Sequence, residues 1–242
     1  MQAMILAAGL GTRMRPLTDH TPKPMLNAAG KPLLAHQLER LIKAGVNRIV
    51  VNTSYLAEQI EDYIAQNHWP VDIALSYEPE PLETAGGLQQ ALKQGLLSDQ
   101  EVILLVNGDI WCDYDLEQLK TAAAALSQGL LLAHLVLTDN PPHNPDGDFR
   151  LSEPTEEISQ VQNKISTRQD NRCYTFSGIS LIHPALIPMN QPPPIALGPL
   201  LRAATDQGQV SGEYYQGYWL DVGTPERLQQ LSDYLEQNPA AG

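Results

Sequence analysis

The first stretch whose residue types and spacing suggest chemistry lies near the N-terminus. An apolar run over residues 3–7 leads into Ala8-Gly9-Leu10-Gly11-Thr12-Arg13, and Lys23 follows between two prolines. Glycines directly after a buried strand let backbone N–H groups approach phosphate oxygens closely. Arg13 offers a planar set of donors to a phosphate, and Lys23 offers a compact positive charge. The pattern indicates a phosphate-binding loop, with a tight connection bearing exposed basic residues as the alternative.

Two familiar phosphate-binding signatures do not fit this loop. A P-loop requires Gly-Lys followed by Ser or Thr at its end, and the chain has no such ending here. The dinucleotide-binding fingerprint requires a third glycine where the chain has Arg13. We expect Arg13 and Lys23 in a solvated cleft.

Two aspartates are candidate metal ligands beside this loop. Asp109 follows the apolar run 102–106 through Asn107-Gly108, and the carboxyl end of a parallel strand would direct it into the ligand crevice. The alternative is a simple turn, because Asn-Gly-Asp forms turns in many settings. Asp221 precedes a helix, but Thr224 before Pro225 is the better N-cap. Asp221 is therefore left without a local structural role.

The elements that must position these residues alternate between strand and helix. Apolar runs predict strands at 3–7, 48–52, 73–77, 102–106 and 130–137, and helical periodicity predicts helices at 32–44, 56–67, 86–97 and 116–126. Beyond them we expect a loop at 139–145, a polar stretch with weak strand content at 153–172, strands at 176–182 and 214–220, and helices at 195–207 and 225–235. This order indicates an α/β fold with a mostly parallel sheet covered by helices on both faces. We interpret residues 1–242 as a single domain, with a first half at about 1–138 that carries the glycine loop and a smaller part at about 139–242 that carries the closing helix.

Composition limits the class of protein. Fifteen basic against 28 acidic residues give a net charge of −13, which argues against a nucleic-acid binder. No apolar run approaches the length of a membrane helix, so we expect no membrane partner. The two cysteines are far apart and are expected to be free thiols in the cytoplasm. The six histidines lack metal-ligand spacing, and His36 is expected on a helix surface.

Taken together, these motifs resemble one known family. Gly-x-Gly-Thr-Arg-x-x-Pro-Leu-Thr followed by Pro-Lys-Pro is similar to the signature of the nucleoside-diphosphate-sugar pyrophosphorylases, and Trp-x-Asp-x-Gly-Thr resembles their late motif. The resemblance implies a Rossmann-like nucleotidyltransferase fold that uses Mg²⁺, an NTP and a sugar-1-phosphate. Its implied nucleotide and metal residues are Gly9, Gly11 and Thr12 around the triphosphate, Arg13 and Lys23 as the catalytic cations, and Asp109 with Asp221 on Mg²⁺.

The same resemblance implies positions for the base and the sugar. Thr84, Gly86 and Gly87 would lie beside the base, although Thr84 can instead be an ordinary helix cap. The implied sugar-phosphate residues are Asn107, Gly147, Asp148, Ser177 and Gly178. Alternatives remain for these as well, because Asp148 can end a turn and Ser177-Gly178 can form a strand bulge.

Within the family, the likeness is greatest to the branch that transfers a uridylyl group from UTP to N-acetylmuramate-1-phosphate in cell-wall recycling. The segments 82–84, 106–109, 147–151 and 175–179 carry this likeness, and Arg150 and Arg202 are candidates for the lactyl carboxylate of that sugar. The alternatives are mannose-, heptose- or glucose-1-phosphate as the acceptor, or a non-catalytic sugar-nucleotide sensor. A sensor would not need both metal carboxylates. We expect a monomer or a small homo-oligomer.

Overall fold

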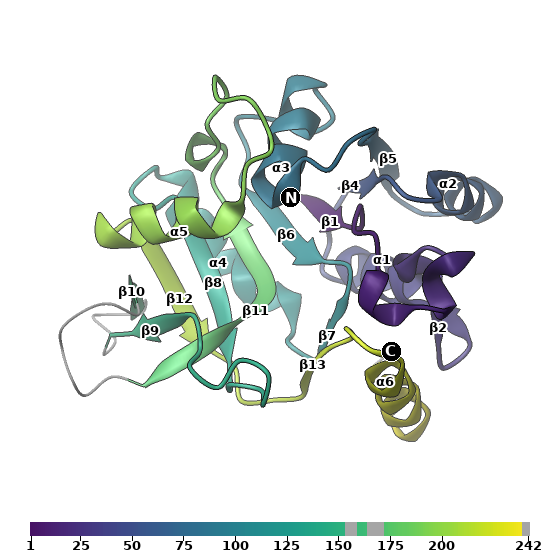
Figure 1. Ribbon diagram of the computed structural model, residues 1–242. Coiled ribbons are helices and arrows are strands. Elements are labelled where there is room, and N and C mark those ends of the chain that lie inside the picture. Colours follow the sequence, from purple (N-terminus) through teal and green to yellow (C-terminus); the bar gives the residue numbers. More distant parts are fainter. Residues whose placement is uncertain (153–158, 164–171, 239–242) are drawn as a thin grey trace.

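The computed structural model describes residues 1–152, 159–163 and 172–238, and within them one nine-stranded sheet forms the centre of the molecule (Figure 1). Across the sheet the strands are β5 (Asp72–Tyr77), β4 (Arg48–Thr53), β1 (Gln2–Leu6), β6 (Ile103–Asn107), β11 (Cys173–Ile182), β8 (Ala133–Thr138), β12 (Val210–Tyr214), β10 (Ser159–Asn163) and β9 (Phe149–Leu151).

Most of the strands run in the same direction. β5, β4, β1 and β6 pair in parallel, and so do β8 and β12. β11 is antiparallel to both of its neighbours, β6 and β8, and joins the two parallel groups into one sheet. The predicted mostly parallel sheet is confirmed. The parallel strands align their carboxyl ends at one edge, where ligands bind in such sheets.

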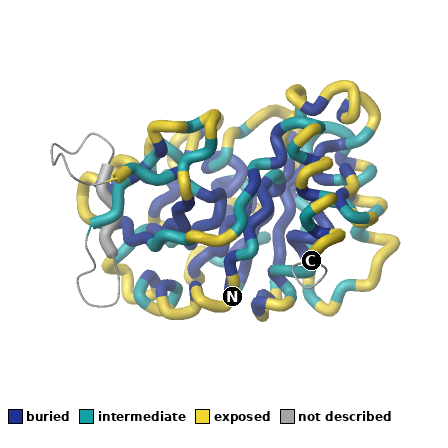
Figure 2. Tube along the Cα trace, turned by 90° about the horizontal axis from the view of Figure 1, so that it is seen from below, coloured by how far each residue is buried: buried dark blue, intermediate teal, exposed yellow. Residues whose placement is uncertain are grey.

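Helices cover both faces of the sheet, as predicted. α1 (Leu33–Lys43), α2 (Ala57–Gln66) and α4 (Leu119–Ser127) pack on one face, and α3 (Glu83–Lys93) and α5 (Leu197–Asp206) pack on the other. Alternate residues of a strand point to opposite faces, so Ala3 and Ile5 join the first core cluster and Met4 joins the second. Figure 2 shows the strands buried between these two layers.

A smaller unit lies beside the candidate metal residues. β7 (Ile110–Cys112) pairs with β13 (Trp219–Asp221), and α6 (Pro225–Gln237) closes the fold over a third apolar cluster that includes Trp111. The Thr224 hydroxyl accepts a hydrogen bond from the Arg227 backbone N–H at 3.4 Å, which confirms the predicted N-cap. A two-stranded pair, β2 (Asn27–Ala28) and β3 (Lys31–Pro32), precedes α1.

Short 3₁₀ helices complete the described secondary structure. Three of them follow β1, and the others precede α4 and follow β11. They span Thr12–Met14, Leu17–Asp19, Lys23–Met25, Leu116–Gln118 and Pro184–Leu186. Every helix in the described ranges is too short or too polar to cross a bilayer.

Several local predictions were wrong. α3 begins at Glu83 rather than at Gly86, so Thr84 lies inside the helix and does not cap it. The single strand predicted at 214–220 is two strands, because β12 ends at Tyr214 and β13 begins at Trp219. The predicted polar stretch 153–172 contains β10, as its weak strand content indicated, while 153–158 and 164–171 lie outside the described residues.

His36 is buried rather than on a helix surface, with an exposed fraction of 3%. Its Nε2 lies 2.9 Å from the Ala28 carbonyl oxygen, and its ring packs edge-on against Trp111. Burial lowers the pKa of His36 below its usual 6.5. His36 therefore belongs to the core, where α1 packs against the β2–β3 pair and Trp111.

Candidate active site

The site is built from residues that stand in one row at the carboxyl ends of three parallel strands. The register pairs Leu6 of β1 with Asn52 of β4 on one side and with Asn107 of β6 on the other. Ser76 of β5 is in register with Asn52, and Glu78 follows two positions later, where its N–H donates to the Thr53 carbonyl at 2.7 Å. Polar side chains at the ends of apolar strands thus face the same crevice.

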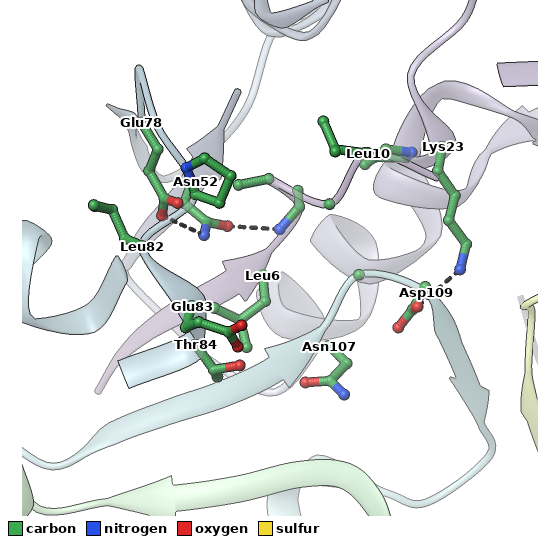
Figure 3. A pocket seen from close by; sticks show the side chains of 16 residues that line it. Leu6, Leu10, Lys23, Asn52, Glu78, Leu82, Glu83, Thr84, Asn107 and Asp109 are labelled. Carbon is green, nitrogen blue, oxygen red and sulfur yellow. Dashed lines mark hydrogen bonds and ion pairs between the residues drawn. The ribbon is translucent and has the colours of Figure 1, made fainter. Parts of the chain in front are cut away.

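A cleft of about 330 Å³ opens at this edge of the sheet (Figure 3). It is lined by Leu6, Ala7, Ala8, Gly9, Leu10, Lys23, Pro24, Asn52, Glu78, Pro81, Leu82, Glu83, Thr84, Asn107, Gly108 and Asp109. Figure 3 places Glu78 and Leu82 toward one end of the cleft and Lys23 with Asp109 toward the other. A loop of glycines, a cation and a carboxylate therefore meet in one cavity.

The two glycines of the phosphate loop have different surroundings. A side-chain carbon at Gly9 would meet no atom within 4 Å, although Gly9 lines the cleft. Gly11 has a φ of +62°, and a side-chain carbon there would lie 2.9 Å from Thr18 Cγ2. The Thr18 hydroxyl donates to the Gly11 carbonyl at 2.8 Å, which fixes this turn. Gly11 is thus required by the fold, whereas Gly9 leaves open space beside the cleft.

Lys23 forms an ion pair with Asp109 at one end of the cleft (Figure 3). Its Nζ lies 2.8 Å from Asp109 Oδ2, with side-chain exposed fractions of 10% for Lys23 and 39% for Asp109. Lys23 lines the cleft as expected, but it is buried rather than solvated, with an exposed fraction of 9% for the whole residue. Arg13 is exposed, but it is not among the residues that line the cleft. A buried lysine has a fixed direction, which suits the positioning of a charged ligand.

The pairing of β7 with β13 brings the backbones of Asp109 and Asp221 close together. The Val222 N–H donates to the Asp109 carbonyl at 2.8 Å. Asp221 Oδ2 lies 2.8 Å from Arg227 Nη1 and 3.3 Å from His143 Nε2. Arg13 Nη1 lies 3.3 Å from where a side-chain carbon of Gly223 would be, so the phosphate loop reaches the same turn.

The two aspartates fit Mg²⁺ by their chemistry. Mg²⁺ takes hard oxygen ligands, and protein sites often supply only one or two carboxylates while waters and substrate phosphates complete the shell. Within the described ranges no group of three or more His, Cys, Asp and Glu side chains is placed to enclose a metal. The two aspartates lie on neighbouring backbone segments beside the predicted phosphate loop, and their carboxylates fit a divalent metal whose other ligands are waters and phosphate oxygens.

Sequence reasoning missed a buried pair on the opposite wall of the cleft. The Asn52 amide donates to Glu78 Oε1 at 2.7 Å and its oxygen accepts from the Ala7 N–H at 2.6 Å. Glu78 is only 2% exposed, and burial raises the pKa of its carboxyl above the usual 4.5. The signal was present in the sequence as an asparagine that ends the apolar run 49–51. The pair ties the ends of β4 and β5 to the start of the phosphate loop.

Gly86 and Gly87 lie behind the cleft wall rather than on it. The Gly86 N–H donates to the Ile195 carbonyl at 3.0 Å, which joins α3 to the segment before α5. A side-chain carbon at Gly87 would lie 2.6 Å from Glu78 Oε1 and 3.1 Å from Asn52 Nδ2. Glycine at 87 is therefore needed so that α3 can pack on the Asn52–Glu78 pair. Among the three residues predicted beside the base, only Thr84 lines the cleft.

The residues predicted to contact the sugar phosphate also divide into those that line the cleft and those that lie outside its lining. Asn107 lines the cleft. Gly178 has a φ of +85°, and a side-chain carbon there would lie 2.9 Å from Asn107 Nδ2, so both the backbone and the space favour glycine. Ser177 is fully buried, and its hydroxyl accepts from the Ile179 N–H at 3.2 Å. The pairing of β11 with β8 shifts register between Phe176 and Ser180, so the ladder is irregular at Ser177-Gly178, where a bulge was the alternative.

Gly147 and Asp148 fasten the loop after β8. Asp148 Oδ2 accepts from the Phe176 N–H at 2.9 Å, and the Asp148 N–H donates to the Tyr174 carbonyl at 2.7 Å. Gly147 has a φ of +65°, and a side-chain carbon there would lie 2.9 Å from the Tyr174 backbone. This loop carries His143 to Asp221, so it borders the site through a histidine that sequence reasoning had not selected.

Comparison with known proteins identifies the family. The sequence model of the nucleotidyl transferase family matches residues 2–238. The chain belongs to this family. N-acetylmuramate alpha-1-phosphate uridylyltransferase of Neisseria meningitidis is 44% identical over 95% of this chain and 96% of its own length.

A second curated member of the nucleotidyl transferase family is more distant. The catalytic subunit beta of mannose-1-phosphate guanylyltransferase from Xenopus tropicalis is 29% identical over 93% of this chain, which spans 62% of the length of that protein. Solved structures have the same nucleotidyltransferase fold. A UDP-glucose pyrophosphorylase solved with UDP-glucose has a TM-score of 0.76 at 17% identity, with 98% of each chain covered. A putative glucose-1-phosphate thymidylyltransferase from Bacillus anthracis has a TM-score of 0.77 at 16% identity, with 97% of this chain and 95% of that chain covered.

Proposed function

We propose that this nucleotidyltransferase transfers a uridylyl group from UTP to N-acetylmuramate-1-phosphate and releases pyrophosphate. The observation that carries the reaction class is the meeting of Gly9, Lys23 and Asp109 in one cleft at the carboxyl ends of β1 and β6. The choice of substrates is supported by the 44% identity, over nearly both full lengths, to the uridylyltransferase of that name.

The chemistry is an in-line displacement at the α-phosphorus of UTP. A phosphate oxygen of the sugar-1-phosphate forms the new bond, and the bond from the α-phosphorus to the bridging oxygen of the leaving pyrophosphate breaks. The attacking oxygen is already ionised, so the reaction needs no general base. The main barrier is that two anions must meet and negative charge must move onto the leaving group. Catalysis therefore comes from positioning and charge neutralisation.

The nucleotide half supplies the phosphate contacts. Gly9, Gly11 and Thr12 offer backbone N–H groups to the triphosphate, and Arg13 binds it with its guanidinium. Lys23 reaches the phosphates of both reactants from a buried stem, and its ion pair with Asp109 holds the ammonium at the mouth of the loop. The open space beside Gly9 is the feature of the loop that favours close approach of a phosphate.

Asp109 and Asp221 would hold Mg²⁺, which would neutralise charge on the triphosphate when bound. Both carboxylates have cationic partners of their own, namely Lys23 for Asp109 and Arg227 for Asp221. These cations would reduce the electrostatic repulsion between the two carboxylates before a metal binds.

The base and the sugar lie on either side of these phosphate contacts. Thr84 lines the cleft where the base would enter, and Gly86 and Gly87 support that wall by letting α3 approach. Residues from about 139 to 242 would form the sugar-phosphate half, with Asn107 as the contact that lines the cleft. Gly147, Asp148, Ser177 and Gly178 shape the backbone that borders it.

Two further points concern the acceptor and the cellular role. Neither Arg150 nor Arg202 is among the residues that line the 330 Å³ cleft, so a contact with the lactyl carboxylate would lie on the rim beyond it. The proposed product belongs to cell-wall recycling and the proposed location is the cytoplasm. A sugar-nucleotide sensor is disfavoured because it would not need both aspartates and Lys23, and the segments that carry all three meet beside the cleft.

A matrix of four NTPs against N-acetylmuramate-, N-acetylglucosamine-, mannose- and glucose-1-phosphate tests the substrate pair. Pyrophosphate release and the mass of the sugar nucleotide are measured together at fixed Mg²⁺. We expect the highest kcat/KM for UTP with N-acetylmuramate-1-phosphate. A preference for GTP with mannose-1-phosphate would refute this pair and keep nucleotidyl transfer, whereas no product from any pair would refute transfer itself.

A further inference from the structure

Glu83 has a backbone conformation that is unfavourable for a residue with a side chain. It is the first residue of α3 and has a φ of +62°. Among the described residues, Ala29, Leu56 and Glu83 are the non-glycine residues with positive φ. Glycine adopts this left-handed region without steric cost, whereas Glu83 retains a side chain there despite the backbone strain.

The side chain of Glu83 has no structural task that accounts for this choice. Glu83 is exposed and lines the cleft, and no hydrogen bond or ion pair of its carboxylate occurs within the described part of the chain. Figure 3 shows the carboxylate directed into the cleft beside Leu6 and Thr84. An open carboxylate in a binding cleft is a set of hydrogen-bond acceptors for a ligand.

The position of Glu83 along the cleft indicates which part of a nucleotide it meets. Lys23 and Asp109 mark the phosphate end, and the Asn52–Glu78 pair with Leu82 marks the far end. A nucleoside triphosphate with its phosphates on Lys23 and its base at the far end has its ribose in between. Neighbouring ribose hydroxyls can both donate to one carboxylate, and acidic residues bind ribose hydroxyls in other nucleotide sites.

We propose that Glu83 accepts hydrogen bonds from the 2′ and 3′ hydroxyls of the bound NTP and selects ribonucleotides over 2′-deoxyribonucleotides. This inference rests on the proposed function, because it takes an NTP as the ligand of the cleft. The acceptor sugar also carries hydroxyl groups, and the measurements below distinguish the two sources.

The test compares Glu83→Ala with Glu83→Gly. Both variants remove the carboxylate, but only glycine relieves the left-handed strain. Binding of UTP and dUTP is measured by calorimetry without acceptor, and thermal unfolding is measured in parallel. The native protein should prefer UTP by about 10- to 100-fold, the difference that a hydrogen bond to a charged group makes. Both variants should lower this preference to about threefold or less.

Stability should change in a different pattern. Glu83→Gly should unfold at a temperature about 2–6 °C higher than Glu83→Ala, because left-handed strain is removed in a chain of this size. Ala29→Gly is the matched control, since Ala29 has a φ of +50° and is absent from the cleft lining. It should leave the ratio of UTP to dUTP affinity unchanged.

Two results would overturn the proposal. One is a native-like preference for UTP over dUTP in both Glu83 variants. The other is an unchanged preference together with a raised KM for the sugar-1-phosphate, which would assign the carboxylate to the acceptor. Because nucleotide binding is measured without acceptor, failure of the proposed acceptor chemistry leaves this comparison intact.

Discussion

Replacing Gly9 with alanine should weaken NTP binding without weakening the fold. A side-chain carbon at Gly9 meets no atom within 4 Å, and the φ of Gly9 lies outside the left-handed region. Alanine there should therefore leave the free energy of unfolding unchanged or raise it by about 0.4–1 kcal/mol, because the unfolded chain loses freedom. In the cleft, the methyl group would occupy the space that a phosphate oxygen needs. The loss of one hydrogen bond to a charged phosphate should raise the Kd for UTP by about 10- to 100-fold.

Gly11→Ala in the same loop is the matched control, because we expect it to destabilise the fold. Its φ of +62° and the 2.9 Å approach to Thr18 Cγ2 make alanine strained and crowded. Left-handed strain of about 1–2 kcal/mol and overpacking of about 1–3 kcal/mol should together cost about 2–5 kcal/mol. For a chain of this size, the midpoint of thermal unfolding should fall by roughly 4–20 °C.

Calorimetric titration with Mg²⁺-UTP and thermal unfolding of both variants give the two readouts. We expect Gly9→Ala to unfold like the native protein and to bind UTP poorly, and Gly11→Ala to unfold early. If Gly9→Ala binds UTP within twofold of the native protein, the loop does not hold the phosphates as described. Early unfolding of Gly9→Ala would refute the claim that the space beside Gly9 is kept for a ligand.

Three further predictions concern the carboxylates and the wall of the cleft. Asp109→Asn and Asp221→Asn should each lower kcat by at least about 100-fold and raise the Mg²⁺ concentration for half-maximal activity, and near-native turnover of either at limiting Mg²⁺ would remove it from the metal site. Gly87→Ala should destabilise the protein by about 2–4 kcal/mol in urea denaturation, because its methyl would lie 2.6 Å from the buried Glu78 carboxylate, and a native-like midpoint would show that this contact relaxes freely. Burial raises the pKa of Glu78 above 4.5, so the folded state binds this proton more tightly than the unfolded state does. Its stabilising contribution should be complete below about pH 4.5 and should be lost as pH rises through the folded pKa, a slope that Glu78→Gln should reduce in pH-dependent denaturation.

The sheet and its helices followed from patterns that act over short stretches of chain. The apolar runs 49–51 and 103–106 are buried on both faces and become parallel strands, and amphipathic periodicity placed most of the helices within a few residues. The helix predicted to begin at Gly86 was wrong because α3 begins with a left-handed residue, Glu83, and has no side-chain cap to signal its start. The strand predicted at 214–220 was wrong because an aromatic-rich sequence continues through the connection between β12 and β13.

The site was less accessible to sequence reasoning because its contacts join distant segments. Lys23 is 86 positions from Asp109, and Asn52 is 26 positions from Glu78, so their pairing depends on strand order and register. The roles of Gly87 and Gly178 likewise follow from side chains that pack against them in three dimensions. Residue types could indicate a phosphate loop and a metal carboxylate, but they could not show that Arg227 and His143 contact Asp221.

The central claim is that the cleft between the phosphate loop and Asp109 transfers a nucleotidyl group to a sugar phosphate. The most direct measurement follows pyrophosphate release from UTP with and without N-acetylmuramate-1-phosphate, together with the mass of the sugar nucleotide, in the native protein and in Asp109→Asn. We predict pyrophosphate release that requires the sugar phosphate, equals the UDP-sugar formed, and is lost in the variant. Pyrophosphate release that proceeds equally without the sugar phosphate, or equally in Asp109→Asn, would contradict the account.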